Sequence, residues 1–280
     1  MDRETKLRKL QQLELQIALE IQRICKKNGL RCFLIYGSLL GAVRHGGFIP
    51  WDDDMDMGML REDYDKFAEA CQTDLGPEFL WQSWDNDPSY PFPAGKVRLK
   101  GTHAKEIFSP EGLEDGIYVD VFPFDAVPDG VWTRKVTGWQ YRVWKRLLWV
   151  KKGYGRCIRQ ESAVQRLRYN LAAAVAFFLP YGWLKRRMKA AMGKCRGQRT
   201  RQVAAPGDWA YSRQFVTRAW AEDLVSVPFD GEELPAFREA DSVLRKIYGD
   251  YMQLPPEDQR GGHEFERIDF GPYEAGVERK

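Results

Sequence analysis

The chain has 280 residues, enough for one large domain or two small ones. Hydrophobic residues make up 44% of the sequence and aromatic residues 13%, a composition that excludes an intrinsically disordered protein. The five cysteines form no CxxC pair and there are three histidines, so neither a structural zinc site nor a disulfide framework is expected. The start of the chain lacks the apolar segment of a signal peptide, and we expect a cytoplasmic protein.

Charge is distributed unevenly along the chain. The formal net charge is +3, yet residues 130–207 contain 19 Lys or Arg residues and a single acidic one, Glu161. The remaining residues carry 24 basic and 39 acidic side chains. Such a bias predicts a polyanionic or membrane-surface partner for the basic segment.

Helical and strand patterns alternate in the first half of the sequence. Apolar residues at helical spacing predict a helix over residues 5–27, which Asn28 and Gly29 end. Short apolar runs predict buried strands, and Pro123 is expected to close the last of them. The predicted strands are 31–36, 54–60, 95–99 and 116–122, and short helices are expected at 38–44 and from residue 61.

The second half begins with a basic segment, 131–200, that is predicted to be mainly helical. Its apolar run, residues 171–179, is nine residues long, whereas a membrane-spanning helix needs about 20. A buried core helix and an interfacial segment are equally favoured for this run. The C-terminal part is acidic and rich in loops, with a helix expected at about 233–248.

Residues 37–56, GSLLGAVRHGGFIPWDDDMD, carry four carboxylates close together. On a strand beginning at Asp54, Asp54 and Asp56 would share one face, roughly 6.6–6.8 Å apart along the backbone. Two carboxylates at that spacing can converge on a divalent cation, and Asp52 could join them. Oxygen ligands favour Mg²⁺ or Mn²⁺ over zinc. Asp53 should point to the opposite face and matter less.

A glycine-serine turn precedes these carboxylates. A strand that ends at Gly37-Ser38 and enters a helix exposes backbone N–H groups, which together with the helix dipole favour a phosphate. The Ser38 hydroxyl adds a donor, Gly37 allows close approach to the backbone, and Arg44 could clamp the phosphate.

Three other interpretations of the aspartates were weighed. A solvated acidic turn is disfavoured because the flanking residues are apolar. A calcium EF-hand loop requires Gly at its sixth position and Glu at its twelfth, where this chain has Met57 and Asp63. A Walker P-loop is excluded because no GxxxxGK[ST] motif occurs here.

A third acidic residue of the site is predicted on a neighbouring strand. Asp120 is a lone acid among apolar and aromatic residues, and a buried carboxylate is costly unless it is paired or binds a metal. Asp125 is expected to cap a turn or helix. Lys96 and Arg98 share one strand face and could neutralise phosphate, although a surface pair is equally favoured. His45 and His103 show no partner in the sequence.

Three sequence blocks in this order resemble the LicD family: residues 37–56, VDVFP at 119–123, and YGDYMQLPPEDQR followed by His263. Proteins of this family attach phosphocholine or related phospho-alcohols to surface glycans, and fukutin-related protein is a more distant relative. The similarity extends over roughly residues 20 to 270.

The resemblance implies an α+β fold with a nucleotidyltransferase-like mixed β-sheet core, flanking helices and a largely helical basic insertion. We expect residues 1–130 to form the core with its N-terminal helix, 131–207 the basic aromatic helical region, and 208–280 the part that completes the catalytic domain. It also implies that Asp54 and Asp56, with Asp52 nearby, form the metal-binding motif for Mg²⁺ or Mn²⁺, and that Asp120 is the third acidic position.

A CDP-linked donor follows from the resemblance as well. The C-terminal block is a family signature that we expect to help shape the donor pocket. Its tyrosine rings could face a quaternary ammonium, although core packing is the favoured interpretation. The residues expected to bind the donor are Gly37, Ser38, Arg44, Lys96, Arg98, Tyr248, Tyr251, Arg260 and His263.

The predicted activity is transfer of a phospho-alcohol, with phosphocholine favoured, from a CDP-linked donor to a hydroxyl of a glycan precursor. That precursor would belong to teichoic acid, lipopolysaccharide or capsule. Asp120 would accept the hydroxyl proton, and choline, ribitol, glycerol and ethanolamine remain open as the alcohol. A lipid-linked acceptor would bring residues 131–207 to the inner membrane face as a peripheral contact. The alternatives are a nucleotidyltransferase that moves a nucleoside monophosphate, and a non-catalytic nucleic-acid-binding protein. Nucleic acid is not the expected partner, because the basic segment lacks a recognised binding motif.

Overall fold

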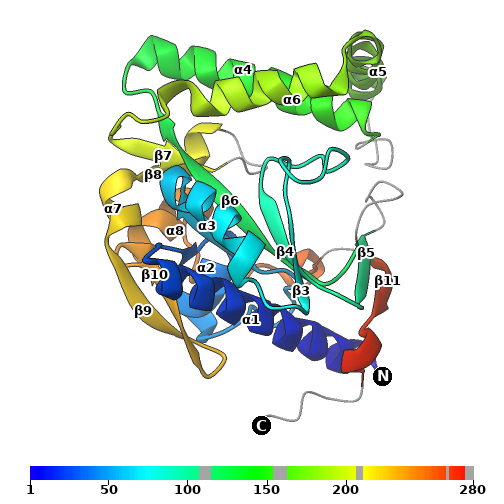
Figure 1. Ribbon diagram of the computed structural model, residues 1–280, viewed down its shortest axis with the longest axis vertical. Helices are drawn as coiled ribbons and strands as arrows, with labels where there is room; N and C mark the ends of the chain where they lie inside the picture. Colours follow the sequence, from blue (N-terminus) through cyan, green and yellow to red (C-terminus); the bar gives the residue numbers. More distant parts are fainter. Residues whose placement is uncertain (107–114, 154–162, 206–210, 263–264, 275–280) are drawn as a thin grey trace.

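The computed structural model describes residues 1–106, 115–153, 163–205, 211–262 and 265–274 (Figure 1). Its helices are α1 Arg3–Asn28, α2 Tyr36–His45, α3 Arg61–Asp74, α4 Val131–Lys151, α5 Ala163–Phe178, α6 Tyr181–Met192, α7 Arg218–Glu222 and α8 Ala240–Tyr248. Its strands are β1 Phe33–Leu34, β2 Asp56–Leu60, β3 Phe79–Gln82, β4 Gly95–Leu99, β5 His103–Glu106, β6 Tyr118–Val127, β7 Gln202–Ala204, β8 Phe215–Thr217, β9 Leu224–Phe229, β10 Glu232–Phe237 and β11 Phe265–Asp269.

A mixed sheet forms the centre of the molecule. The strands run in the order β1-β2-β6-β4-β3, and β7 and β8 extend the sheet from the far end of β6. The β2–β6 pair is parallel, and the other pairs within this sheet are antiparallel. Two separate antiparallel pairs, the hairpin β9–β10 and the long-range pair β5–β11, lie beside it. Helices and a largely antiparallel sheet together are consistent with the predicted α+β class.

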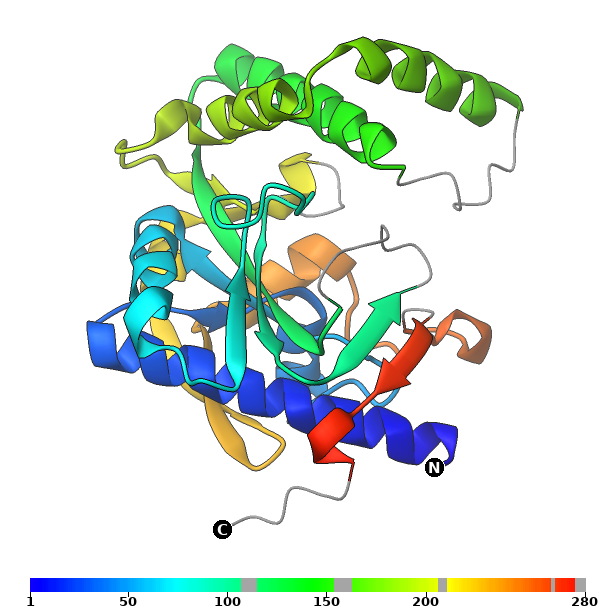
Figure 2. The same cartoon turned by 45° about the vertical axis from the view of Figure 1, so that its right-hand side comes forward.

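The first helix packs its apolar stripe on the core. Leu10, Leu13, Ile17, Ile21 and Ile24 are at most 1% exposed, at the spacing expected for one buried helix face. Gly29 ends α1 in the left-handed conformation, with φ of 64°, and its N–H bonds back to the helix. Figures 1 and 2 show α1 running along one side of the molecule. The predicted N-terminal helix and its end are confirmed.

Several predicted strand boundaries were wrong. β2 begins at Asp56 rather than at residue 54, and β1 covers two residues of the predicted 31–36. Pro123 does not close β6, which continues to Val127. β6 pairs with β4 over residues 118–121 and with β7 over 125–127. Pro123 therefore falls in the gap between these two partners, where its missing N–H is tolerated.

The C-terminal helix was also predicted too long. Residues 232–237 pair with β9 as a strand, and α8 covers the second half of the expected 233–248 helix. Leu234 and Ala236 lie two residues apart on the same face of β10, and both are completely buried.

The basic segment folds as a separate layer of helices. α4, α5 and α6 lie together on one side of the sheet, at the top of Figures 1 and 2. They share a second apolar cluster that includes Tyr141, Leu148, Leu184 and Met188. The apolar run 171–179 was predicted to be either a buried core helix or an interfacial segment. The core-helix interpretation was wrong, because Ala176 is the one buried residue of α5. Within the described ranges, no helix combines the length and the apolar character needed to cross a bilayer.

A bidentate ion pair connects α3 to β6. Arg61 Nε lies 2.7 Å from Asp125 Oδ1, and Arg61 Nη2 lies 2.8 Å from Asp125 Oδ2. Both side chains are largely buried, with 17% and 11% exposure. The expectation that Asp125 caps a turn was wrong, because its carboxylate instead neutralises the guanidinium at the start of α3.

Replacing Arg61 with Met should lower the free energy of unfolding by about 3–5 kcal/mol, because the buried Asp125 carboxylate would lose its counter-charge. The double variant Arg61→Met, Asp125→Leu should recover much of this loss, since no buried charge then remains. Chemical denaturation of the three proteins measures both values. Equal stability of wild type and single variant would contradict a structural role for the pair.

Candidate functional site

Three charged residues stand side by side on three adjacent strands. Asp56 and Asp120 are register partners across the parallel β2–β6 pair, and Lys96 is the register partner of Asp120 across β4–β6. The Lys96 ammonium donates to Asp120 Oδ2 at 2.8 Å. Because neighbouring strands lie about 4.8 Å apart, this row brings the two carboxylates close together, as the sequence predicted.

The Asp56 carboxylate sits in an unfavourable environment for a negative charge. Burial raises its pKa well above the ordinary value, and the charges of Asp54, Asp120 and Asp52 raise it further. Lys96 acts in the opposite direction. Together these effects disfavour the charged form of the Asp56 carboxyl.

Asp52, Asp53 and Asp54 form a compact cluster beside this row. One carboxylate oxygen of each lies within 4.8 Å of those of the other two. The expectation that Asp53 faces away from Asp54 was therefore wrong. It assumed strand alternation from residue 54, but β2 begins at Asp56 and the three aspartates precede it. Asp53 is 8% exposed, so it is the most buried of the three.

The glycine-serine turn holds the aspartate segment in place. The Ser38 hydroxyl oxygen accepts a hydrogen bond of 2.8 Å from the Asp56 backbone N–H. A Cβ added to Gly37 would lie 2.7 Å from Asp52 Oδ2, so glycine at this position makes room for that carboxylate. Tyr36, which precedes it, has a φ of 47°, a strained value for a residue other than glycine. The predicted phosphate contact of this turn stays a prediction.

The C-terminal block packs against the same segment. Arg44 Nη1 donates to the Tyr251 carbonyl oxygen at 2.6 Å, which connects α2 to the block. The Arg260 guanidinium lies 5.0 Å from the centre of the Trp51 ring. A Cβ added to Gly262 would lie 2.3 Å from the Asp53 carboxyl carbon. The block whose role the sequence left open therefore borders the aspartates.

Its two tyrosines have different environments. Tyr248 lies among charges of the site, and burial first, then Asp56, Asp52 and Asp54, raise the pKa of its hydroxyl. Tyr251 is 6% exposed and donates its hydroxyl proton to Asp241 at 2.8 Å, so it packs in the core. His263 lies outside the described residues.

The remaining predicted residues have contacts of a structural kind. Arg98 is buried and donates to Gln82 Oε1 at 2.7 Å and to the Gly116 carbonyl at 2.8 Å. The surface-pair interpretation of Lys96 and Arg98 was wrong, because both are 6% exposed. Both histidines have partners that the sequence did not reveal: Arg44 donates to His45, and His103 lies 2.7 Å from Asp115.

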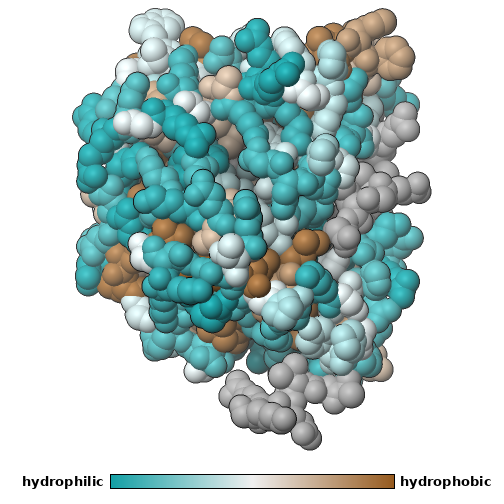
Figure 3. All heavy atoms as spheres, in the orientation of Figure 1, coloured by the Kyte–Doolittle hydropathy of each residue, from teal (hydrophilic) through white to brown (hydrophobic). Residues whose placement is uncertain are grey.

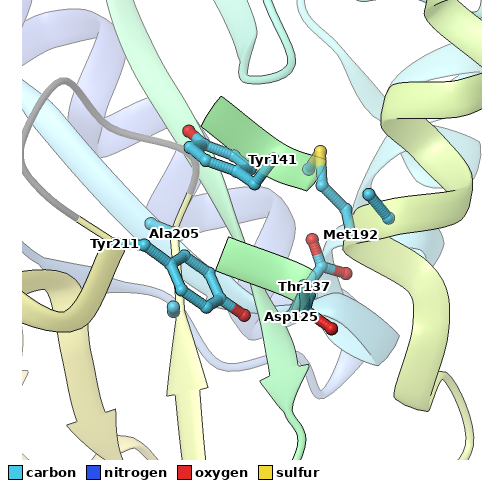
Figure 4. Close-up of a pocket in the computed structure, with 8 residues that line it drawn as sticks. Asp125, Thr137, Tyr141, Met192, Ala205 and Tyr211 are labelled. Atoms are coloured by element: carbon cyan, nitrogen blue, oxygen red, sulfur yellow. The ribbon is translucent and has the colours of Figure 1, made fainter. Parts of the chain in front are cut away.

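A cavity at the other end of β6 is distinct from this site. It lies between the helical layer and the sheet, where Thr137, Tyr141 and Tyr211 surround Asp125 (Figure 4). Asp125 is five residues beyond Asp120, about 17 Å along the strand. The cavity holds about 10 Å³, roughly the space of one water molecule. It is therefore too small for a substrate.

The residues of this site lie in a segment that matches a known protein family. Residues 29–148 match the family described as LicD/FKTN/FKRP, nucleotidyltransferase domain. Residues 29–148 of this chain therefore carry a domain of the LicD family. The matched LicD segment contains Asp52, Asp54, Asp56, Lys96 and Asp120, but neither α1 before residue 29 nor the C-terminal block.

Two curated LicD-family relatives extend the comparison. The lipopolysaccharide cholinephosphotransferase LicD of Haemophilus influenzae is 24% identical over 267 residues, which cover 92% of this chain and 95% of that protein. Ribitol 5-phosphate transferase FKRP of human and mouse is 60% identical over 59 residues, covering 19% of this chain and 12% of those proteins.

One buried acidic residue near these aspartates, Glu14 on α1, was absent from the sequence predictions. Its side chain is 3% exposed, and burial followed by the charges of Asp54, Asp53, Asp52 and Asp56 raises the pKa of its carboxyl. A signal was present in the sequence: Glu14 interrupts the apolar stripe of Leu10, Ile17 and Ile21 at helical spacing.

Gly37→Ala should displace the Asp52 carboxylate and destabilise the protein by about 1–3 kcal/mol, because the added methyl group overlaps Asp52 Oδ2. It should also weaken Mn²⁺ binding, measured by titration calorimetry. Gly182→Ala in α6 is the matched control, since nothing lies within 4 Å of its added Cβ. Unchanged stability and Mn²⁺ binding in Gly37→Ala would show that Asp52 does not need this space.

Proposed function

We propose that this protein is a Mg²⁺-dependent transferase that moves a phospho-alcohol, most simply phosphocholine, from a CDP-linked donor to a hydroxyl of a cell-surface glycan precursor. One observation carries the proposal: Asp56, Asp120 and Lys96 form a row across adjacent strands, with Asp52 and Asp54 beside them. The functions named for the two relatives, cholinephosphotransferase and ribitol 5-phosphate transferase, support transfer of a phospho-alcohol. The family description supports a nucleotidyltransferase-like core.

The donor atoms suit a hard divalent cation. Asp52, Asp54, Asp56 and Asp120 offer carboxylate oxygens, and Lys96 is the basic side chain that contacts this group in the described structure. All-oxygen sites of this kind favour Mg²⁺ or Mn²⁺. When bound, the cation would neutralise charge that develops on the phosphate oxygens. The residues present therefore fit the cofactor.

In the proposed reaction, the acceptor hydroxyl oxygen forms a bond to the phosphorus that carries the alcohol, and the bond from that phosphorus to the CMP oxygen breaks. Asp120 accepts the hydroxyl proton through the oxygen that Lys96 does not hold. Lys96 fixes the orientation of the Asp120 carboxylate through its 2.8 Å contact. Lys96 is buried, and Asp56 and Asp120 are half-buried, so the acceptor hydroxyl would approach the row from its open side.

The donor would lie between the start of α2 and the C-terminal block. Ser38 and the backbone N–H groups at the start of α2 would face its phosphates. Tyr248 and Arg260 would border the pocket from the other side, where Tyr248 already lies among the aspartate charges and Arg260 over Trp51. Arg44 is better assigned to connecting α2 with this block than to clamping phosphate, because its guanidinium bonds to the Tyr251 carbonyl.

The helical layer is proposed as the part that meets a lipid-carried acceptor at an anionic membrane surface. Exposed apolar residues follow one face of α5 at helical spacing, and α4 exposes two tryptophans with Val136. Tan and brown spheres mark this apolar surface over α5 at the upper right of Figure 3. The α5 stripe comprises Val164, Leu167, Leu171, Val175 and Phe178, and the tryptophans are Trp132 and Trp139. Apolar side chains among 19 Lys and Arg residues are complementary to anionic lipid.

Asp56→Asn and Asp120→Asn should each lower CMP release from CDP-choline with Mg²⁺ by more than about 100-fold, because even outer partners of metal ligands contribute 10–100-fold. Asp223→Asn is the control, since Asp223 is an exposed partner of Arg238 on the surface. Each assay contains purified acceptor glycan. Four donors are compared in parallel: CDP-choline, CDP-ribitol, CDP-glycerol and CDP-ethanolamine.

Two outcomes would contradict the proposal. Full CMP release by Asp56→Asn would remove the aspartates from the chemistry. Release of pyrophosphate from a nucleoside triphosphate, with no CMP from any CDP-alcohol, would instead identify a nucleotidyltransferase.

Leu167→Ser, Leu171→Ser and Phe178→Ser together should weaken binding to phosphatidylglycerol vesicles by about 10-fold or more, because three apolar side chains would no longer be buried in the interface. Leu254→Ser, which changes an exposed leucine outside the helical layer, should leave vesicle binding intact. Co-sedimentation at low and high salt gives both values. Wild-type protein that ignores anionic vesicles at low salt would disprove the membrane contact.

A further inference from the structure

Glu14 is a buried carboxylate whose Oε2 atom has no hydrogen-bond partner within the described part of the chain. It lies in the middle of α1, within a stripe whose other members, Leu10, Ile17 and Ile21, are at most 1% exposed. The Glu14 side chain is 3% exposed, and its Oε2 atom has no hydrogen-bond partner among the described residues. A buried carboxylate without compensation is costly, so a leucine or glutamine would stabilise the fold better here.

The same stretch of α1 adjoins the aspartate segment. Gln11, one turn before Glu14, donates its side-chain N–H to the Asp52 carbonyl oxygen at 2.8 Å. Residues three apart on a helix share a face, so Glu14 lies on the side of α1 that meets this segment. The charges that act on its carboxyl are those of Asp54, Asp53, Asp52 and Asp56, all of the same sign.

A purely structural role does not account for this placement. A structural buried carboxylate is normally held by an Arg or Lys or by several N–H donors, as Asp125 is held by Arg61 in this protein. Glu14 Oε2 instead has no hydrogen-bond partner among the described residues, on the side of α1 where Gln11 bonds to the Asp52 carbonyl. The element that would stabilise all five carboxylates is a cation among them.

We propose that Glu14 is a fifth carboxylate of the divalent-cation site, contributed by α1 from outside the matched family domain. This inference rests on the proposed function, because it assigns a further residue to the same Mg²⁺ site. Its consequence is that α1 is part of the binding machinery for the cation and not solely a packing element. The geometry assigns Glu14 to cation binding, with no part in the transfer of the proton.

The experiment compares the Mn²⁺ affinity of the whole protein and its variants by electron paramagnetic resonance titration in the absence of donor. Glu14→Gln keeps the side-chain shape and removes the charge, and it should weaken Mn²⁺ binding by about 10-fold or more. Glu14→Asp keeps the charge on a shorter side chain and should recover part of the affinity. Glu20→Gln removes the same charge from the same helix at a residue bonded to Arg23 and the Gly76 N–H, and it should bind Mn²⁺ as wild type does.

Thermal unfolding without divalent ions provides a second measurement. Glu14→Gln should melt at a higher temperature than wild type, because one of five crowded charges is gone, and added Mn²⁺ should raise its melting temperature less than that of wild type. Unfolded Glu14→Gln protein would overturn the inference, since the carboxylate would then be required by the fold.

The outcomes separate this inference from the proposed function. Wild-type Mn²⁺ affinity in Glu14→Gln, together with weakened binding in Asp56→Asn, would overturn the role of Glu14 and leave the proposed function standing. Absence of Mn²⁺ binding by the wild-type protein would overturn both. Weakened binding in Glu14→Gln with normal binding in Glu20→Gln supports the inference.

Discussion

The parallel register between β2 and β6 is the constraint on which the site depends. It sets Asp56 opposite Asp120, and the antiparallel register of β4 then sets Lys96 on the other side of Asp120. Backbone hydrogen bonds fix these positions, so the charged row is as rigid as the sheet itself. A slip of one residue in β2 would turn Asp56 to the opposite face and bring Met57 into its place. The Ser38 hydroxyl, which accepts from the Asp56 N–H, helps to hold that register.

Two glycines and one lysine next to the aspartates accommodate their crowded carboxylates. Glycine at residue 37 leaves space for the Asp52 carboxylate, and glycine at residue 262 leaves space for Asp53. Lys96 holds the Asp120 carboxylate at 2.8 Å and lowers the pKa of Asp56, whereas burial and the neighbouring aspartate charges raise it.

The sequence was sufficient to place Asp56 beside Asp120 on neighbouring strands, but it did not reveal every acidic residue close to them. Asp120 could be found because a lone acid in an apolar strand needs a partner, and Asp54 and Asp56 because their spacing suggests convergence. Asp53 was misplaced because alternation was applied before the strand begins at residue 56. Glu14 could be noticed as an interruption of the apolar stripe of α1, but its closeness to the aspartates depends on what α1 packs against, which local pattern does not contain. For the same reason, the apolar run of α5 could not be assigned to core or surface, and residues 232–237 could not be recognised as the partner of β9.

The bond between Arg44 and the Tyr251 carbonyl joins residues 207 positions apart, and Gly262 packs on Asp53 from a similar distance along the chain. During synthesis, the aspartate segment leaves the ribosome long before the residues that enclose it. Contacts of such high sequence separation form late and slow the folding of a domain. The pairing of β1, β2, β4 and β6 can thus form while the chain is still growing, but the acidic segment stays uncovered until residues 251–262 have been added.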